Sequence, residues 1–278
     1  MENPLAKLVP QFFGDYPKQF LELYNQVYVP PELNKDEIKD NLWKAFEFGS
    51  RYHEGQKRKS GEPYFNHCVE VAITLAGWNM DYTTIMAGLL HDVVEDTNIT
   101  LEEIEKEFNK DLANLVDGLT KISGIEFGTR KEKQAGNFMK MLLSVAKDIR
   151  VIIIKFADRM HNMKTITHMP RMKQRRIAIE TRDVYSPLAH RLGMASVKSK
   201  LDDLAFQVLN KDEYDLIASK LKTTNKQRKK LINSYIEPIS NGLEKYKMDC
   251  NIFGRSKSFY SIYGKMLNRN KAFEDIYD

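Results

Sequence analysis

The sequence predicts an all-α protein in which a helical bundle is followed by a helical linker and a small incomplete α/β fragment. Two observations support this prediction. Apolar residues recur at three- and four-residue intervals in segment after segment up to about residue 245, which is the period of amphipathic helices. The interruptions are short and polar or contain proline, as expected for turns between helices, at Pro30, Pro31, Pro63 and Pro170.

Three segments of the first large region are expected to be helical: 67–73, 89–97 and the segment that starts at Thr100. The run at 67–73 starts directly after "GEPYFN", and "LLHDVVEDT" at 89–97 places four ionisable groups within an apolar stretch. Thr100 and Glu103 have the spacing of a capping box. We therefore expect a helix to begin there and to continue through the periodic segment that ends near Thr120.

The segment 147–165 contains four β-branched residues in a row, which locally favour a strand. Its apolar residues nevertheless recur at helical spacing, and we expect one helix with a stripe formed by Ile149, Ile153, Phe156, Met160 and Met163. Such a helix would bring Asp158, Asn162 and Thr165 together on another face.

The polar segment 220–231 is expected to be a solvated helix or a helix junction. Beyond it, a short extended segment is expected before Gly254 and a helix after it, which indicates the start of an α/β unit. We therefore expect a main domain at 1–200, a helical linker at 201–245 and the truncated beginning of a second domain at 246–278.

Composition limits the classes of function. The 278 residues are 42% hydrophobic, without a run of eighteen apolar residues or the residue order of a secretory signal, so we expect a cytoplasmic globular protein that binds no membrane. Cys68 and Cys250 fit no metal-type or redox-type spacing, which agrees with a reducing compartment. A net charge of +5 does not by itself indicate nucleic-acid binding, but it suits a phosphorylated small molecule.

The stretch 89–97 indicates a metal site. On one continuous helix, His91 would lie below Glu95 and Asp92 below Asp96, as two polar columns facing a cleft. The opposite face is apolar, with Ile85, Met86, Leu89, Leu90, Val93 and Val94. Because bare imidazole and carboxylate charges are costly to bury, a bound cation is the simplest explanation.

Two further ligands are needed, and His67 and Asp158 are the best candidates because both lie in apolar, helical context. Together with His91 and Asp92 they form a mixed nitrogen and oxygen set that suits Mn²⁺, with Fe²⁺ or Zn²⁺ as alternatives and Ca²⁺ disfavoured. No histidine occurs between Asp92 and Asp158, which favours one metal ion over two.

Glu95 and Asp96, one turn beyond the ligands, would accept a proton from a water at the metal or orient that water. The plainer interpretation of these acids is a solvated helix end, but their spacing and the apolar opposite face favour a site. The other histidines are expected to be structural or exposed at His53, His168 and His190, and His161 is left open.

Five blocks of the sequence resemble the long Rel/SpoT family of alarmone synthetase/hydrolases, and together they extend over nearly the whole chain. They are "RKSGEPYFNH" (58–67), "HDVVEDT" (91–97), "DGLTKI" (117–122), "KDIRVIIIKFADRMHNMKTI" (147–166) and "YSPLAHRLGM" (185–194). The order His, His-Asp, Asp is common to HD-type phosphohydrolases, whereas "RKSGEPY" and "HNM" single out this family. The resemblance implies an HD-domain helical bundle.

The resemblance also implies an activity: hydrolysis of the 3′-pyrophosphate of ppGpp and pppGpp on a Mn²⁺ centre. By this resemblance the metal ligands are His67, His91, Asp92 and Asp158, and the acid pair acting on the water is Glu95 and Asp96. Arg58 and Lys59 would contact the guanine side, and Ser60, Asn162 and Thr165 would line the nucleotide pocket. From composition alone, "QKRKSGEP" reads as an exposed basic turn.

The segment 254–266 resembles the opening of the family's synthetase domain, where Arg255 and Lys257 would address the phosphates of ATP and Asp278 would be the Mg²⁺-binding acid. The remaining synthetase elements of the family would lie beyond Asp278. We therefore expect this chain to hydrolyse alarmone but not to synthesise it.

Two other functions stay open. One is an HD phosphohydrolase with another substrate, such as a deoxynucleotide or a cyclic nucleotide, for which the "RKSGEPY" loop would have no special purpose. The other is a regulatory module that binds alarmone or a partner protein without turnover, although the presence of Glu95 and Asp96 argues against it. The sequence does not identify a regulatory protein partner.

Overall fold

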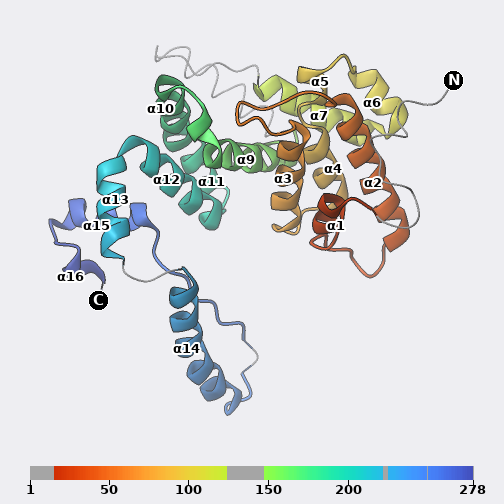
Figure 1. Ribbon diagram of the computed structural model, residues 1–278. Coiled ribbons are helices and arrows are strands. Elements are labelled where there is room, and N and C mark those ends of the chain that lie inside the picture. Colours follow the sequence, from red (N-terminus) through yellow and green to blue (C-terminus); the bar gives the residue numbers. More distant parts are fainter. Residues whose placement is uncertain (1–15, 124–146, 222–224, 249, 278) are drawn as a thin grey trace. The chain divides into compact units, whose positions relative to one another are not determined.

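The computed structural model describes residues 16–123, 147–221, 225–248 and 250–277, and these residues form helices and connecting loops without a β-sheet (Figure 1). The chain divides into two compact units, Met1–His168 and Met169–Asp278. The all-α prediction is thus confirmed for the described part of the chain. Within it, no helix combines the length and the apolar character that crossing a bilayer requires.

The first unit is a helical bundle built around a buried helix, α4. Its elements are α1 (Lys18–Tyr24), α2 (Lys35–Tyr52), α3 (Phe65–Ala76), α4 (Tyr82–Leu90), α5 (Val93–Asp96), α6 (Leu101–Glu107), α7 (Lys110–Ser123), α9 (Ile149–Lys164) and the 3-10 turn η2 (Ile166–His168). Helix α4 packs against α2, α3, α7 and α9, and every residue from Thr84 to Leu90 is buried. His91, which follows Leu90 and is one of the predicted ligands, therefore lies buried within the bundle.

Glycines allow the helices around α4 to approach closely. A Cβ atom at Gly49 in α2 would lie 2.5 Å from a ring carbon of Phe65 and 3.2 Å from the carbonyl oxygen of Leu89. The Phe65 ring is itself buried between helices, so it has little room to move. The close contact of α2 with the end of α4 therefore depends on the absence of a side chain at residue 49.

We expect Gly49→Ala to lower the free energy of unfolding by about 1–3 kcal/mol, the usual range for overpacking a well-packed core. Gly242→Ala is the matched control, because a Cβ atom at this helical glycine meets nothing within 4 Å. Alanine should be neutral or slightly stabilising there, since it is the better helix former. Thermal unfolding followed by circular dichroism compares the two variants, and equal melting temperatures would contradict the packing explanation.

The helix expected to start at Thr100 is confirmed, together with its capping box: Thr100 accepts from the Glu103 amide, and the Glu103 carboxylate accepts from the Thr100 amide. The expectation that it continues to residue 120 is wrong. The helix ends at Glu107, and Asn109 begins α7 by accepting a hydrogen bond from the Leu112 amide at 2.9 Å. Asparagine is a preferred residue at a helix start, and its side chain competes with the continuing helix.

The helix predicted over the β-branched run is confirmed as α9. Its predicted apolar stripe is only partly buried, because Ile149 is 50% exposed and Ile153 is half-buried, whereas the rest of the stripe is buried. Helix α9 packs against α3, α4 and α7, so its buried face is wider than one stripe and also includes Val151, Ile152 and Ile154.

The second unit contains α10 (Arg171–Glu180), the π-helical turn η3 (Thr181–Tyr185), α11 (Ser186–Arg191), α12 (Ala195–Leu209), α13 (Lys211–Lys220), α14 (Asn225–Glu244), α15 (Phe259–Arg269) and α16 (Glu274–Tyr277). Helix α12 packs against α10, η3, α11, α13 and α15. Asp203 of α12 holds the start of α15, since its carboxylate accepts from the amides of Phe259 and Tyr260 at 3.3 and 2.8 Å.

The C-terminal expectations have mixed outcomes. The junction predicted at 220–231 is confirmed, because α13 ends and α14 begins within it, and the helix expected after Gly254 is α15. The described residues 250–257 form no strand, since an extended segment becomes a strand only when another strand pairs with it. Asp278 lies outside the described residues. The break between the compact units precedes residue 200, and the three-part domain division stays a prediction.

Candidate metal centre

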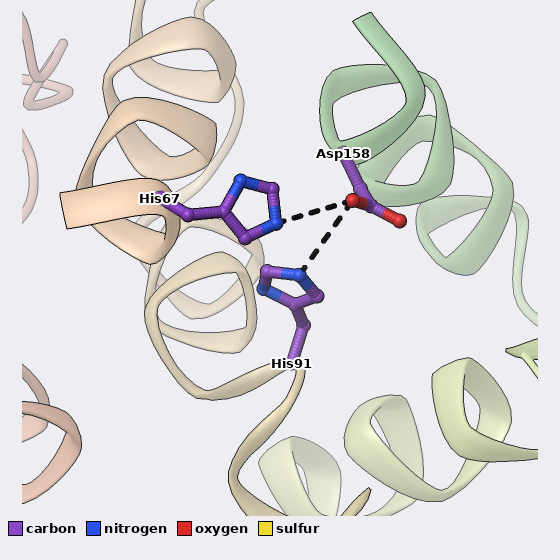
Figure 2. Close-up of side chains that lie close together, drawn as sticks. All are labelled: His67, His91 and Asp158. Carbon is purple, nitrogen blue, oxygen red and sulfur yellow. Dashed lines mark ion pairs between the residues drawn. The ribbon is translucent and has the colours of Figure 1, made fainter. Parts of the chain in front are cut away.

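Two imidazoles and two carboxylates converge in the first unit, from helices α3 and α9 and from the turn after α4. His67 lies in the first turn of α3, His91 and Asp92 follow the last residue of α4, and Asp158 lies in the middle of α9. Figure 2 shows His67, His91 and Asp158 pointing toward one another. The Asp158 Oδ1 atom lies 3.2 Å from His67 Nε2 and 3.9 Å from His91 Nε2, and His91 Nε2 lies 3.1 Å from Asp92 Oδ2.

The predicted continuous helix through 89–97 is wrong. Helix α4 ends at Leu90 and the single-turn helix α5 begins at Val93, so His91 and Asp92 occupy the turn between them. The break directs His91 into the bundle, where it is fully buried, and leaves the Asp92 side chain 13% exposed. Glu95 and Asp96 are exposed at the end of α5, so the four groups do not form two columns on one helix.

The tautomer of His91 suits a metal ligand. Its Nδ1 atom lies 2.8 Å from the Gly88 carbonyl oxygen, which can only accept, so Nδ1 carries the proton. In the neutral ring Nε2 then has a free lone pair directed at the carboxylates, and in the described part of the chain this buried atom has no hydrogen-bond partner. A buried unsatisfied nitrogen is costly, and a divalent cation held by His67, His91, Asp92 and Asp158 would satisfy it. The donor set therefore fits a metal ion.

Burial and charge pairing shift the pKa values in this cluster in opposite directions. Burial lowers the pKa of His67. Burial also acts to lower the pKa of His91, but the Asp92 charge outweighs it and raises that pKa well above its usual value. Burial acts to raise the pKa values of Asp92 and Asp158, but the charges of His91 and Lys155 keep both carboxylates ionised. Both carboxylates are thus ionised, and the positive charges that face them are those of His91 and Lys155.

Four side chains that the sequence analysis did not assign surround the predicted ligands. The Tyr64 hydroxyl donates to Asp92 Oδ2 at 2.8 Å, and Lys155 Nζ lies 3.5 Å from Asp158 Oδ2. The Nδ1 atoms of His161 and His67 are 2.6 Å apart. Cys68 is fully buried beside His91. The positions of Lys155 and His161, three residues before and after Asp158 on α9, could have been read from helical spacing.

Two of the predicted substrate residues join this network. Arg58 Nη2 donates to Asn162 Oδ1 at 2.6 Å, and Asn162 Nδ2 donates to Asp158 Oδ1 at 2.5 Å. For Ser60 and Thr165 the structure gives only local hydrogen bonds, to Glu62 Oε2 at 3.4 Å and to the His161 carbonyl at 3.1 Å. Lys59 is exposed. Asn162 therefore connects the basic loop to a predicted metal ligand.

The loop that carries Arg58 is folded back on itself rather than extended. The Arg58 amide donates to the Glu62 carbonyl at 2.9 Å, and the Tyr64 amide donates to the Gln56 carbonyl at 3.0 Å. Gly61 adopts a φ of 89°, which favours glycine. This geometry turns Arg58 inward, where its Nη1 atom is buried without a hydrogen-bond partner among the described residues. The interpretation of this loop as an exposed basic turn therefore holds for Lys57 and Lys59 but not for Arg58.

Tyr64 is a neighbour of both Asp96 and the predicted ligand Asp92. Burial raises the pKa of the Tyr64 hydroxyl, and the charges of Asp92 and then Asp96 add to this effect. Gln56 Nε2 also donates to the Asp96 carbonyl at 2.9 Å, which ties the basic loop to α5. The remaining histidines are as expected: His53 is buried with its Nδ1 atom 2.8 Å from Gln56 Oε1, and His168 and His190 are exposed.

Comparisons with known proteins agree with this geometry. The model of the HD domain family matches residues 45–195, more than half of the chain. The SpoT bifunctional (p)ppGpp synthase/hydrolase of Escherichia coli K12 is 44% identical over 91% of this chain and 35% of its own length. A guanosine-3′,5′-bis(diphosphate) 3′-pyrophosphohydrolase of Aquifex aeolicus is 42% identical over 86% of this chain and 34% of its own length.

The chain spans about a third of the length of these curated relatives. Among solved structures, a metazoan orthologue of SpoT aligns with 65% of this chain at 25% identity and a TM-score of 0.45, so its likeness in fold is distant. An HD domain implies a divalent metal ion, for which His67, His91 and Asp158 form a candidate site. The resemblance to Rel/SpoT proteins expected from the sequence is confirmed, and the chain belongs to the HD domain family.

Proposed function

We propose that this chain is a Mn²⁺-dependent hydrolase that removes the 3′-pyrophosphate of ppGpp and pppGpp, giving GDP or GTP and pyrophosphate, and so controls the stringent response. The observation that carries the proposal is the convergence of His67, His91, Asp92 and Asp158 next to Arg58 and Asn162. It is supported by relatives whose names state this activity. The cytoplasm, where nucleotides are made and used, is the proposed location.

His67, His91, Asp92 and Asp158 would hold the metal ion. Two imidazoles with two carboxylates favour Mn²⁺ over Ca²⁺, which prefers oxygen ligands alone. When bound, such an ion supplies polarisation of a phosphate oxygen and a lower pKa for a water molecule. Tyr64 and Lys155 support this role, because each contacts one of the carboxylates and limits how it can rotate.

Glu95 and Asp96 are proposed to act on the attacking water. The water oxygen bonds to the phosphorus attached to the ribose 3′ oxygen, the bond from phosphorus to that oxygen breaks, and the 3′ oxygen takes up a proton. A carboxylate at α5 would receive the proton that the water loses. The exposure of both acids supports this role, and Asp96 also shares the neighbour Tyr64 with Asp92.

The nucleotide would bind along the basic loop, with Arg58 and Lys59 at the guanine side and Ser60, Asn162 and Thr165 lining the pocket. A guanidinium can stack on a purine and also donate hydrogen bonds. The buried Nη1 atom of Arg58, which has no hydrogen-bond partner in the described part of the chain, supports a ligand there. The negative charge of ppGpp suits the exposed Lys59 of the same loop.

We expect Arg58→Ala and Lys59→Ala to raise the KM for ppGpp more than they lower kcat, because both side chains would act on the nucleotide rather than on the reacting phosphate. Loss of a charged hydrogen bond corresponds to an increase on the order of tenfold to a hundredfold. Lys57→Ala is the control, since Lys57 is exposed in the same loop and has no proposed role. Steady-state kinetics measure both constants, and a fall in kcat alone would mean that the loop serves the metal centre.

A substrate panel tests the proposed function against its two alternatives. The purified chain is incubated with Mn²⁺ and ppGpp, pppGpp, a deoxynucleoside triphosphate or a cyclic nucleotide, and the products are separated by ion-exchange chromatography. The proposal expects turnover of ppGpp and pppGpp in preference to the others. Preferred turnover of another nucleotide would identify a different HD phosphohydrolase, and binding of ppGpp without any product would identify a regulatory module.

A further inference from the structure

The fully buried thiol of Cys68 lies against the candidate metal centre. Its Sγ atom, a ring nitrogen of His91 and a carboxylate oxygen of Asp92 all lie within 4.8 Å of one another. This group shares His91 with the group formed by His67, His91 and Asp158. The structure therefore contains two overlapping sets of ligand atoms that differ in chemical softness.

A second observation indicates that this position can receive a cation. His91 is fully buried, and its Nε2 atom has no hydrogen-bond partner in the described part of the chain. Since Nδ1 is fixed on the Gly88 carbonyl, Nε2 is the nitrogen left for a metal ion in either set. A metal ion that binds Cys68 therefore has to use the same His91 nitrogen as one that binds the oxygen-rich set.

We propose that Cys68, His91 and Asp92 form an alternative site for soft divalent ions, Zn²⁺ or Cd²⁺, and that such an ion excludes Mn²⁺ from the centre. The exclusion of Mn²⁺ rests on the proposed function, whereas the binding of soft ions does not. Thiolate ligands select soft ions, and Mn²⁺ is at the weak end of the divalent series. On binding, the bond from sulfur to the metal replaces the bond from sulfur to hydrogen, and the proton leaves to solvent.

The chain provides its own control, because Cys250 is the only other cysteine and is exposed in the second unit. Cd²⁺ is titrated into wild type, Cys68→Ala and Cys250→Ala, and the ultraviolet absorption of the thiolate–cadmium bond is recorded. We expect the band in wild type and in Cys250→Ala. It should be absent from Cys68→Ala, which should bind Cd²⁺ at least about tenfold more weakly, as for loss of a metal-site partner.

Binding of Mn²⁺ is measured in parallel by the electron paramagnetic resonance signal of the free ion, with and without Cd²⁺. Circular dichroism confirms folding, and Cys68→Ser is a second variant in case the alanine leaves a disruptive cavity. A folded wild type without the thiolate band, or a band lost in Cys250→Ala, would overturn the proposal. Failure of all three proteins to bind Mn²⁺ would instead count against the proposed function, and retained Mn²⁺ alongside bound Cd²⁺ would overturn the exclusion.

Discussion

Asp158→Ala is expected to abolish Mn²⁺-dependent hydrolysis of ppGpp, with a loss greater than the roughly tenfold to hundredfold effect of removing an outer partner of a metal ligand. Asp158 is the point where three parts of the site meet: it faces His67 and His91, pairs with Lys155 and accepts from Asn162. Its removal would weaken metal binding and leave Lys155 buried near two imidazoles. Asp92→Ala is expected to have the same effect.

The matched control for this variant is Asp40→Ala, which removes an exposed carboxylate from α2 in the same unit. Its turnover and metal content should equal those of wild type. Product formation is measured by chromatography and bound Mn²⁺ by elemental analysis of the dialysed protein. Turnover by Asp158→Ala at the wild-type rate would show that this cluster does not bind the metal ion on which hydrolysis depends.

The double variant Glu95→Gln and Asp96→Asn is expected to slow ppGpp turnover by about a hundredfold to ten-thousandfold, the usual range for loss of a general base. The substitutions keep the size of both side chains but remove their ability to take up a proton. Neither residue is one of the predicted ligands, so Mn²⁺ content should stay at the wild-type level. Single-turnover kinetics with bound Mn²⁺ separate the chemical step from binding.

Glu102→Gln is the control for this second prediction, because it removes an exposed carboxylate from the first turn of the neighbouring α6. It should have no effect on turnover. If the double variant turns over ppGpp as fast as this control, then neither acid acts on the water, and their positions reflect only a solvated helix end.

The helices were predictable because burial imposes a period on the sequence, but their ends were not. The capping box at Thr100 and the helix α9 followed from residue spacing alone. The breaks after Leu90 and Glu107 did not, since the apolar pattern continues across both of them. At Asn109 a local side-chain hydrogen bond stops the pattern from forming one helix.

The sequence predicted which side chains converge in the candidate metal centre, but not how they are arranged. Histidine and aspartate in apolar helices need a partner for their polar groups, and so His67 and Asp158 could be grouped with His91 and Asp92 from sequence. Some of the surrounding residues share a helix with a predicted ligand, such as Lys155 on α9, whereas others contact a ligand from a different element. Tyr64 and Cys68 reach the centre only through the packing of α3 against α4, which no spacing within one helix encodes.

The most direct measurement of the central claim is the fate of ppGpp when it is incubated with this chain with Mn²⁺, without added metal and with excess chelator. We expect GDP and pyrophosphate in equal amounts with Mn²⁺, and neither product in excess chelator. Unchanged ppGpp in the presence of Mn²⁺, or equally fast hydrolysis in excess chelator, would contradict a metal-dependent alarmone hydrolase.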